Sequence, residues 1–171
     1  MNNFDFAIVI LRLGVGLIFA AHGAQKLFGW WGGPGLAGWQ GAMSHMGFRP
    51  ARLFALTSAL VELGGGLLLA AGFLTPFVAA TLVALVVVIV GQVHWSNGLF
   101  NSEAGFEYPL VLGVAAAAVG IAGPGAFSID AAIGFNFAPV IPLALMLAGI
   151  LAGFANLTIP RVGAVPTPSE E

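Results

Sequence analysis

Long apolar runs recur along this chain, separated by short segments rich in Gly, Pro and polar residues. Each run approaches the length of about 20 residues that a helix needs to cross a hydrocarbon core of about 30 Å. The expected spans are residues 7–28, 53–74, 76–95, 105–122 and 135–157. Apolar length favours helix even in the β-branched part of the third run, so the pattern predicts an all-α membrane protein.

Proline marks the limits of two runs. Thr75 before Pro76 is typical of a helix start. In the last run Pro139 suits an opening turn, whereas Pro142 would bend the helix or mark its true beginning. The C-terminal segment, residues 158–171, is rich in Pro and ends in two Glu, so we expect a flexible tail.

The segment between the first two runs, residues 29–41, is rich in Gly and Trp. It is too long for a minimal turn and too apolar for an ordinary solvated loop, so it should lie at the membrane interface or dip back between helices. Trp30, Trp31 and Trp39 suit an interfacial aromatic belt. The same rings could line the mouth of a pocket for a flat, apolar molecule, because such sites are mostly apolar.

Glycines recur in the first two runs, at Gly14, Gly16 and Gly23 and again at residues 64–66. Small residues let membrane helices approach closely. We therefore expect the first two spans to pack tightly against each other.

Composition supports the membrane assignment, since 59% of the 171 residues are hydrophobic and only 7% are charged. Mean hydropathy is +1.01. A net charge of −2 with five Lys and Arg leaves no basic surface for nucleic acid, so that class of partner is excluded. The sequence has no Cys, which excludes disulfides, thiolate metal ligands and thiol catalysis by this chain.

The basic residues predict an orientation. With five spans, Lys26, Arg49, Arg52 and Arg161 fall on one side of the membrane, which the positive-inside rule makes cytoplasmic. The N-terminus would then be external and the C-terminus cytoplasmic. If the fifth run lay in the interface instead of spanning, the C-terminus would change sides.

Ionisable residues inside the spans are the strongest functional signal, because such residues are costly in lipid unless they face the protein interior and find partners. The candidates for an intramembrane polar cluster are Arg12, His22, Gln25, Lys26, Glu62, His94 and Glu107. Helical counting places Arg12 and Lys26 on one face of the first span, and Glu62 near mid-membrane on the antiparallel second span. Glu62 should therefore reach His22 or Arg12, while His94 and Glu107 would join His22 and Lys26 near the cytoplasmic ends.

Structural explanations exist for the same residues. Glu62 and Arg12 could form a buried ion pair that only fixes helix register. Lys26 could extend to the lipid headgroups, and His94 beside Trp95 could anchor the interface. Glu107 near the start of a helix complements the positive helix end. No metal-ligand spacing is present in the sequence, so no metal site is predicted.

Three segments resemble the DoxX family of small bacterial membrane proteins: residues 11–29, residues 62–76 and the GPGAFSID segment at 123–130. This resemblance implies a four-helix transmembrane bundle over residues 7–130, in the bacterial cytoplasmic (inner) membrane. Residues 131–157 depart from the family pattern and predict an additional C-terminal transmembrane helix.

The resemblance also implies a link to quinones, because relatives include the membrane subunit of a thiosulfate:quinone oxidoreductase and members of redox-defence complexes. We therefore expect an accessory or membrane subunit of a redox system that works with a redox-enzyme partner. Its polar pocket would bind a small quinone-like molecule, and it would carry no covalently bound cofactor. Alone it would not be catalytic. A membrane scaffold for a partner protein and a small-molecule transporter are the alternatives.

Overall fold

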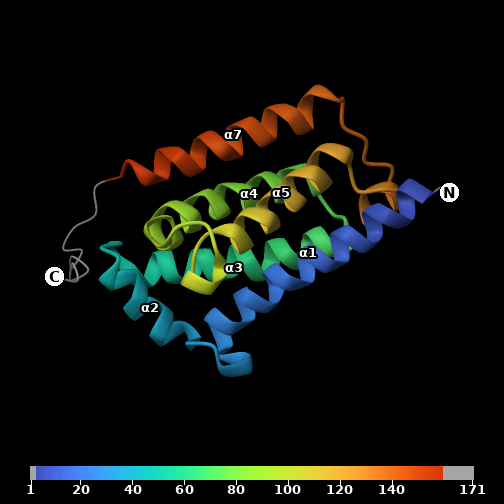
Figure 1. The fold of residues 1–171 in the computed structure, drawn as a ribbon. Helices are drawn as coiled ribbons and strands as arrows, with labels where there is room; N and C mark the ends of the chain where they lie inside the picture. The colour runs from blue at the N-terminus through green and yellow to red at the C-terminus, as the bar shows by residue number, and fades with distance from the viewer. Residues whose placement is uncertain (1–2, 160–171) are drawn as a thin grey trace.

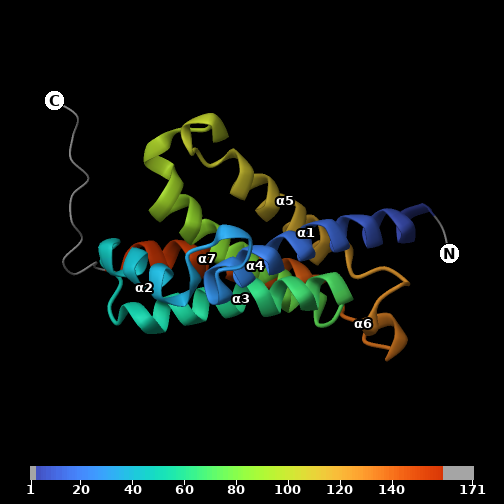
Figure 2. The same ribbon diagram turned by 90° about the horizontal axis from the view of Figure 1, so that it is seen from below.

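The structure, a computed structural model, describes residues 3–159, and regular structure in that range is entirely helical. Its long helices run alternately up and down: α1 (Asn3–Phe28), α3 (Ala51–Ala71), α4 (Thr75–Ile89), α5 (Glu107–Ala122) and α7 (Val140–Leu157) (Figure 1). The helix α2 (Gly35–His45) lies at one end of the bundle, and the short α6 (Ile129–Ala132) lies at the other (Figure 2). The predicted all-α fold is confirmed.

Within residues 3–159, four helical segments are long and apolar enough to cross a membrane. They are Asn3–Phe28, Ala51–Ala71, Thr75–Asn97 and Val140–Leu157. The fourth predicted span corresponds to α5, a shorter apolar helix of 16 residues. Large apolar side chains such as Ile10, Val111 and Leu151 point outward from the bundle, as is required of a surface in contact with lipid. The chain is therefore a multi-pass membrane protein.

Local signals decide the helix ends. The second predicted span ends three residues early, at Ala71, because Gly72 adopts the left-handed conformation (φ 67°) that terminates a helix. The last span begins at Val140 and not at residue 135, which places Pro142 in the first turn where its missing N–H costs nothing. The predicted start at Thr75 is confirmed.

The third predicted span does not stay α-helical to its end. After Ile89 the backbone continues as a π-helical turn, Val90–His94, and then as a 3₁₀ turn, Trp95–Asn97. Two further 3₁₀ turns, Trp30–Gly32 and Asn101–Glu103, lie in the connections. Part of the predicted Gly- and Trp-rich loop is helical, since α2 begins at Gly35.

The α4 helix lies at the centre of the bundle, packed against α3, α5 and α7. The main core gathers apolar side chains from all the long helices, including Val15, Phe19, Leu69, Leu82, Val86, Leu112, Val119 and Met146. A second, smaller core joins α2 to α3 through Met43, Phe48 and Ala55. The second core fixes α2 beside α3 and so shapes one end of the molecule.

The tight packing predicted for the first two spans is confirmed, and glycines make it possible. A Cβ atom on Gly16 of α1 would lie 2.6 Å from the backbone oxygen of Gly66 on α3, and one on Gly23 would overlap the backbone of Leu63. Gly14, by contrast, has open space where a Cβ atom would be. Only part of the glycine pattern therefore marks the helix contact.

Three of the four basic residues in the described range lie at one end of the bundle, as the sequence suggests, and Arg12 lies toward the other end. Lys26, Arg49 and Arg52 lie at the end that carries α2, while Asp5 and Asp130 lie at the opposite end (Figure 1). The predicted tail over residues 158–171, with Arg161, falls outside the described residues except for its first two. Which end faces the cytoplasm stays a prediction.

The glycine contact gives a stability prediction. Gly16→Ala should lower the thermal unfolding temperature in mild detergent by several degrees, because overpacking a tight contact costs about 1–3 kcal/mol. Gly14→Ala on the same helix is the matched control and should change little, since nothing lies within 4 Å of its added methyl group. An equal decrease in unfolding temperature in the two variants would contradict the close approach of α1 and α3.

Candidate functional site

The carboxylate of Glu62 is paired with Lys26, and not with Arg12 or His22 as helical counting predicts. Lys26 Nζ donates to Glu62 Oε1 at 2.5 Å, and the two side chains are 15% and 3% exposed. The absence of a side chain at Gly23 brings α1 against Leu63 at this level, which places Lys26 and Glu62 within reach of each other. Among the described residues, the second oxygen of Glu62 has no hydrogen-bond partner.

An aromatic ring on α2 completes this group. The Lys26 ammonium lies 4.4 Å from the centroid of the Trp39 ring, a distance at which the ring face attracts a cation. The indole N–H of Trp39 donates to Ser58 Oγ at 2.9 Å, and Ser58 in turn donates to the Ala55 carbonyl. We call Lys26, Glu62, Trp39 and Ser58 the lysine group; it joins α1, α2 and α3.

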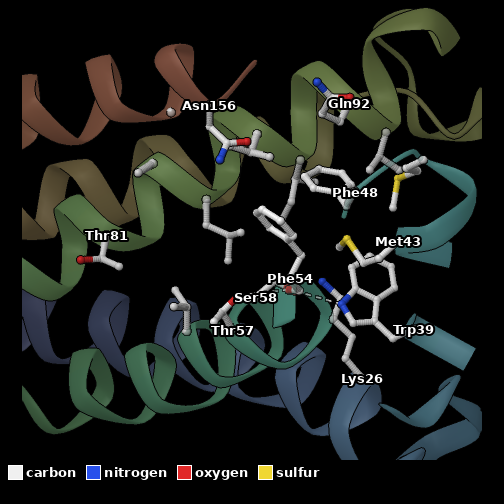
Figure 3. Close-up of a pocket in the computed structure, with 18 of the residues that line it drawn as sticks. Lys26, Trp39, Met43, Phe48, Phe54, Thr57, Ser58, Thr81, Gln92 and Asn156 are labelled. Atoms are coloured by element: carbon white, nitrogen blue, oxygen red, sulfur yellow. Dashed lines mark hydrogen bonds between the residues drawn. The ribbon is translucent and has the colours of Figure 1, made fainter. Parts of the chain in front are cut away.

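A cavity of about 280 Å³ opens beside the lysine group, between α2, α3, α4 and α7 (Figure 3). This volume is near the lower end of the range for small-molecule sites, about 300–1,000 Å³. Lys26, Trp39 and Ser58 line it together with mostly apolar side chains, among them Met43, Met46, Phe48, Phe54, Val61, Leu85, Val88 and Ile89. The cavity therefore combines an apolar wall with a few polar groups, as ligand sites do.

The remaining polar side chains of this cavity differ in what they offer a ligand. The hydroxyls of Thr57 and Thr81 donate to carbonyls of their own helices, so these residues add little polarity. Gln92, in the π-helical turn after α4, and Asn156 of α7 bring carboxamide groups to the side away from Lys26 (Figure 3). Donors thus approach the cavity from two sides.

Arg12 belongs to a different part of the molecule. Its guanidinium, 3% exposed, donates to the carbonyls of Ala70 (2.9 Å), Pro124 (2.5 Å) and Phe127. It is also attracted by the carboxylate of Asp130. Arg12 therefore joins α1 to the end of α3 and to the turn between α5 and α6, far along α1 from Lys26.

Asp130, which the sequence analysis did not single out, is fully buried beside this arginine. Its carboxylate accepts from the backbone N–H groups of Leu74 (2.8 Å) and Thr75 (3.0 Å) and from the Thr75 hydroxyl (2.9 Å). These contacts satisfy donors at the start of α4, which have no partner within the helix. A negative group there also complements the helix dipole.

His22 meets a phenol in place of the expected carboxylate. Its Nε2 lies 3.2 Å from the Tyr108 hydroxyl, and the two rings meet edge to face with centroids 5.9 Å apart. Tyr108, in the first turn of α5, is 41% exposed. Neither residue lines the cavity beside Lys26.

His94, Glu107 and Gln25 also lie outside that cavity. His94 Nδ1 is 2.6 Å from the Ala104 carbonyl, and Glu107 accepts from the backbone N–H of Asn101 at 2.7 Å, so both hold the connection between α4 and α5. Gln25 packs directly beneath Gly33, before α2. The single polar pocket expected from the sequence is thus divided into separate groups.

The three tryptophans predicted at a pocket mouth separate in the same way. Trp39 lines the cavity, whereas Trp30 and Trp31 are 55% and 70% exposed and contact each other edge to face. Their outward position agrees with the interfacial alternative. Within residues 3–159, no three His, Asp or Glu side chains come together in a way that could hold a metal ion.

A family model described as DoxX matches residues 7–95, which include most of α1, all of α3 and α4, and the whole lysine group. The chain belongs to the DoxX family. The DoxX match ends before α5, so the GPGAFSID segment and α7 lie outside it. The searches of curated proteins and of solved structures found no match.

The lysine group gives a prediction that separates the two possible partners of Glu62. Lys26→Met should destabilise the protein by about 3–5 kcal/mol, because it leaves a buried carboxylate without its partner. Adding Glu62→Leu should recover much of that loss, so the two substitutions are strongly non-additive. Arg12→Met and Glu62→Leu should instead be additive. Thermal unfolding of all five variants tests this, and coupling between positions 12 and 62 would contradict the pairing described.

The arginine contact predicts a local effect. Arg12→Lys keeps the charge but removes the planar fork that reaches several carbonyls, so residues 121–137 should lose protection. Hydrogen exchange followed by mass spectrometry should show faster exchange there while residues 36–61, around the cavity, stay unchanged. An equal increase in the exchange rate of both segments would contradict this local role.

Proposed function

We propose that this chain binds a small quinone-like molecule in the cavity beside the lysine group, as the accessory or membrane subunit of a larger redox system. The observation that carries the proposal is the Lys26 ammonium, which lines an apolar cavity while Glu62 fixes it in place. DoxX membership adds support, because the match includes these residues. The proposal places the protein in the cytoplasmic membrane of a bacterium.

The chemistry of the cavity suits this class of ligand. A quinone is flat and apolar and carries carbonyl oxygens that only accept hydrogen bonds. The cavity offers aromatic and aliphatic walls with Lys26 and Gln92 at its edges, and ammonium and carboxamide groups can donate to such oxygens. The pairing of Lys26 with Glu62 leaves the ammonium with further N–H groups for a ligand.

In this proposal the chain binds and orients the ligand, and a partner enzyme supplies the electrons. A hydrogen bond from Lys26 would stabilise negative charge that develops on the quinone oxygen during reduction. Glu62 would hold the ammonium in position and could accept or return a proton. The sequence offers no Cys for electron transfer within this chain.

Fluorescence of Trp39 tests the proposal. A variant that keeps Trp39 and replaces Trp30, Trp31 and Trp95 by Phe should be quenched by para-benzoquinone along a saturable curve. Adding Lys26→Met and Glu62→Gln together, which leaves no unpaired charge, should weaken the apparent affinity about tenfold, as is typical when a hydrogen bond from a charged group is lost.

The control keeps Trp31 as its single tryptophan. Trp31 is 70% exposed and does not line the cavity, so its quenching should rise linearly as the quinone partitions into detergent. Identical linear quenching in both variants would contradict the proposal. The scaffold alternative would then gain support if a redox enzyme still co-purified with the protein.

A further inference from the structure

The cavity is longer than a small ring requires. Its lining residues on α4 and on the π-helical turn that follows run from Thr81 to Val93, and Thr81 and Gln92 are separated by roughly 16 Å along a helix axis. Thr81 lies at the opposite end of the cavity from Gln92 and Trp39 (Figure 3). A head group held by Lys26 would therefore leave the part of the cavity near Thr81 unfilled.

That far part of the cavity is apolar in character. Its walls there are Val61 of α3 with Ala84 and Leu85 of α4. The Thr81 hydroxyl is bonded to the Phe77 carbonyl at 2.9 Å, so Thr81 has little to offer a polar ligand. The donors Lys26 and Gln92 instead lie near α2 and in the π-helical turn after α4. The cavity is thus polar near Lys26 and apolar near Thr81.

The cavity also reaches the lipid-facing surface. Thr57, Thr81 and Ala152 line it from three different helices and are themselves exposed. In a bilayer this side is occupied by hydrocarbon and not by water. A molecule with a polar head and an apolar chain could therefore enter sideways from the membrane.

We infer that the ligand is a single-tailed lipid, whose hydrocarbon or isoprenoid tail lies along α4 between α3 and α7 while its head faces Lys26. This inference rests on the proposed function and specifies its substrate class: a membrane-soluble quinone and not a water-soluble one. It also gives α7, which lies outside the DoxX match, the role of one wall for the tail.

A comparison of two quinones tests the inference through the single-Trp39 protein. A decyl-tailed benzoquinone should bind at least about tenfold tighter than the tail-less compound, after correction for partition into detergent, because burial of each methylene group adds affinity. Ala84→Phe, which fills the far part of the cavity, should abolish this advantage and leave the affinity for the tail-less compound unchanged.

Two further variants make the result decisive. Ala152→Phe narrows the same part of the cavity from α7 and should have the same effect if Ala84→Phe fails to fold. Ala118→Phe adds the same ring to the exposed face of α5, away from the cavity. This variant should still bind the decyl-tailed quinone more tightly than the tail-less one.

The remaining outcomes distinguish failure of the inference from failure of the proposed function. Saturable binding of both quinones with equal affinity would overturn the inference while leaving the proposed function standing. Failure of both to bind would reject the proposed function and the inference together. Native mass spectrometry that shows a two-tailed phospholipid retained in the cavity, undisplaced by the decyl compound, would also overturn the inference.

Discussion

The ion pair between Lys26 and Glu62 is the interaction on which the candidate site depends. A charge in a hydrocarbon layer must find its partner within the protein. Here the ammonium and the carboxylate meet at 2.5 Å across α1 and α3, at a level where Gly23 lets the two backbones come close. Because the pair holds the ammonium at the wall of an apolar cavity, one polar group remains available there to a ligand.

The opposite end of the bundle meets the same requirement with different chemistry. Arg12 has no carboxylate in direct contact among the described residues; it donates to three backbone carbonyls. Asp130, close by, accepts from the start of α4. The three carbonyls that accept from Arg12 belong to the end of α3 and to the turn between α5 and α6. Arg12 and Asp130 therefore have an architectural role, whereas ligand binding is the role proposed for the lysine group.

Apolar length and proline positions made most of the fold predictable from the sequence. The α2 helix was harder, since glycines obscure the spacing of Leu36, Trp39 and Met43, which nevertheless lie on one helical face and pack toward α3. The end of α3 could not be placed either, because Gly72 ends that helix through a backbone conformation that glycine permits but does not impose.

The candidate site was predictable only in part. The sequence identified Lys26, Glu62 and Trp39, but ideal helix heights separate Lys26 from Glu62 by about 10 Å, and only the long lysine side chain and the local approach of α1 bring them together. Helical counting could not separate His22 and Arg12 from the cavity, because their partners, Tyr108 and the carbonyls near α6, lie far away in sequence. Gln92 and Asn156 gave no signal beyond polarity near a helix end.

Photoaffinity labelling is the most direct test of where a ligand binds. The native protein, in mild detergent, would be irradiated with an azido-quinone, digested and mapped by mass spectrometry. If the ligand binds beside Lys26, adducts should lie within residues 36–61 and 81–93, and unlabelled quinone should compete with their formation. A second cavity, of about 440 Å³, lies at the other end of the bundle beside Pro124 and Phe137. Competed labelling confined to residues 121–142, around that second cavity, would contradict ligand binding beside the lysine group.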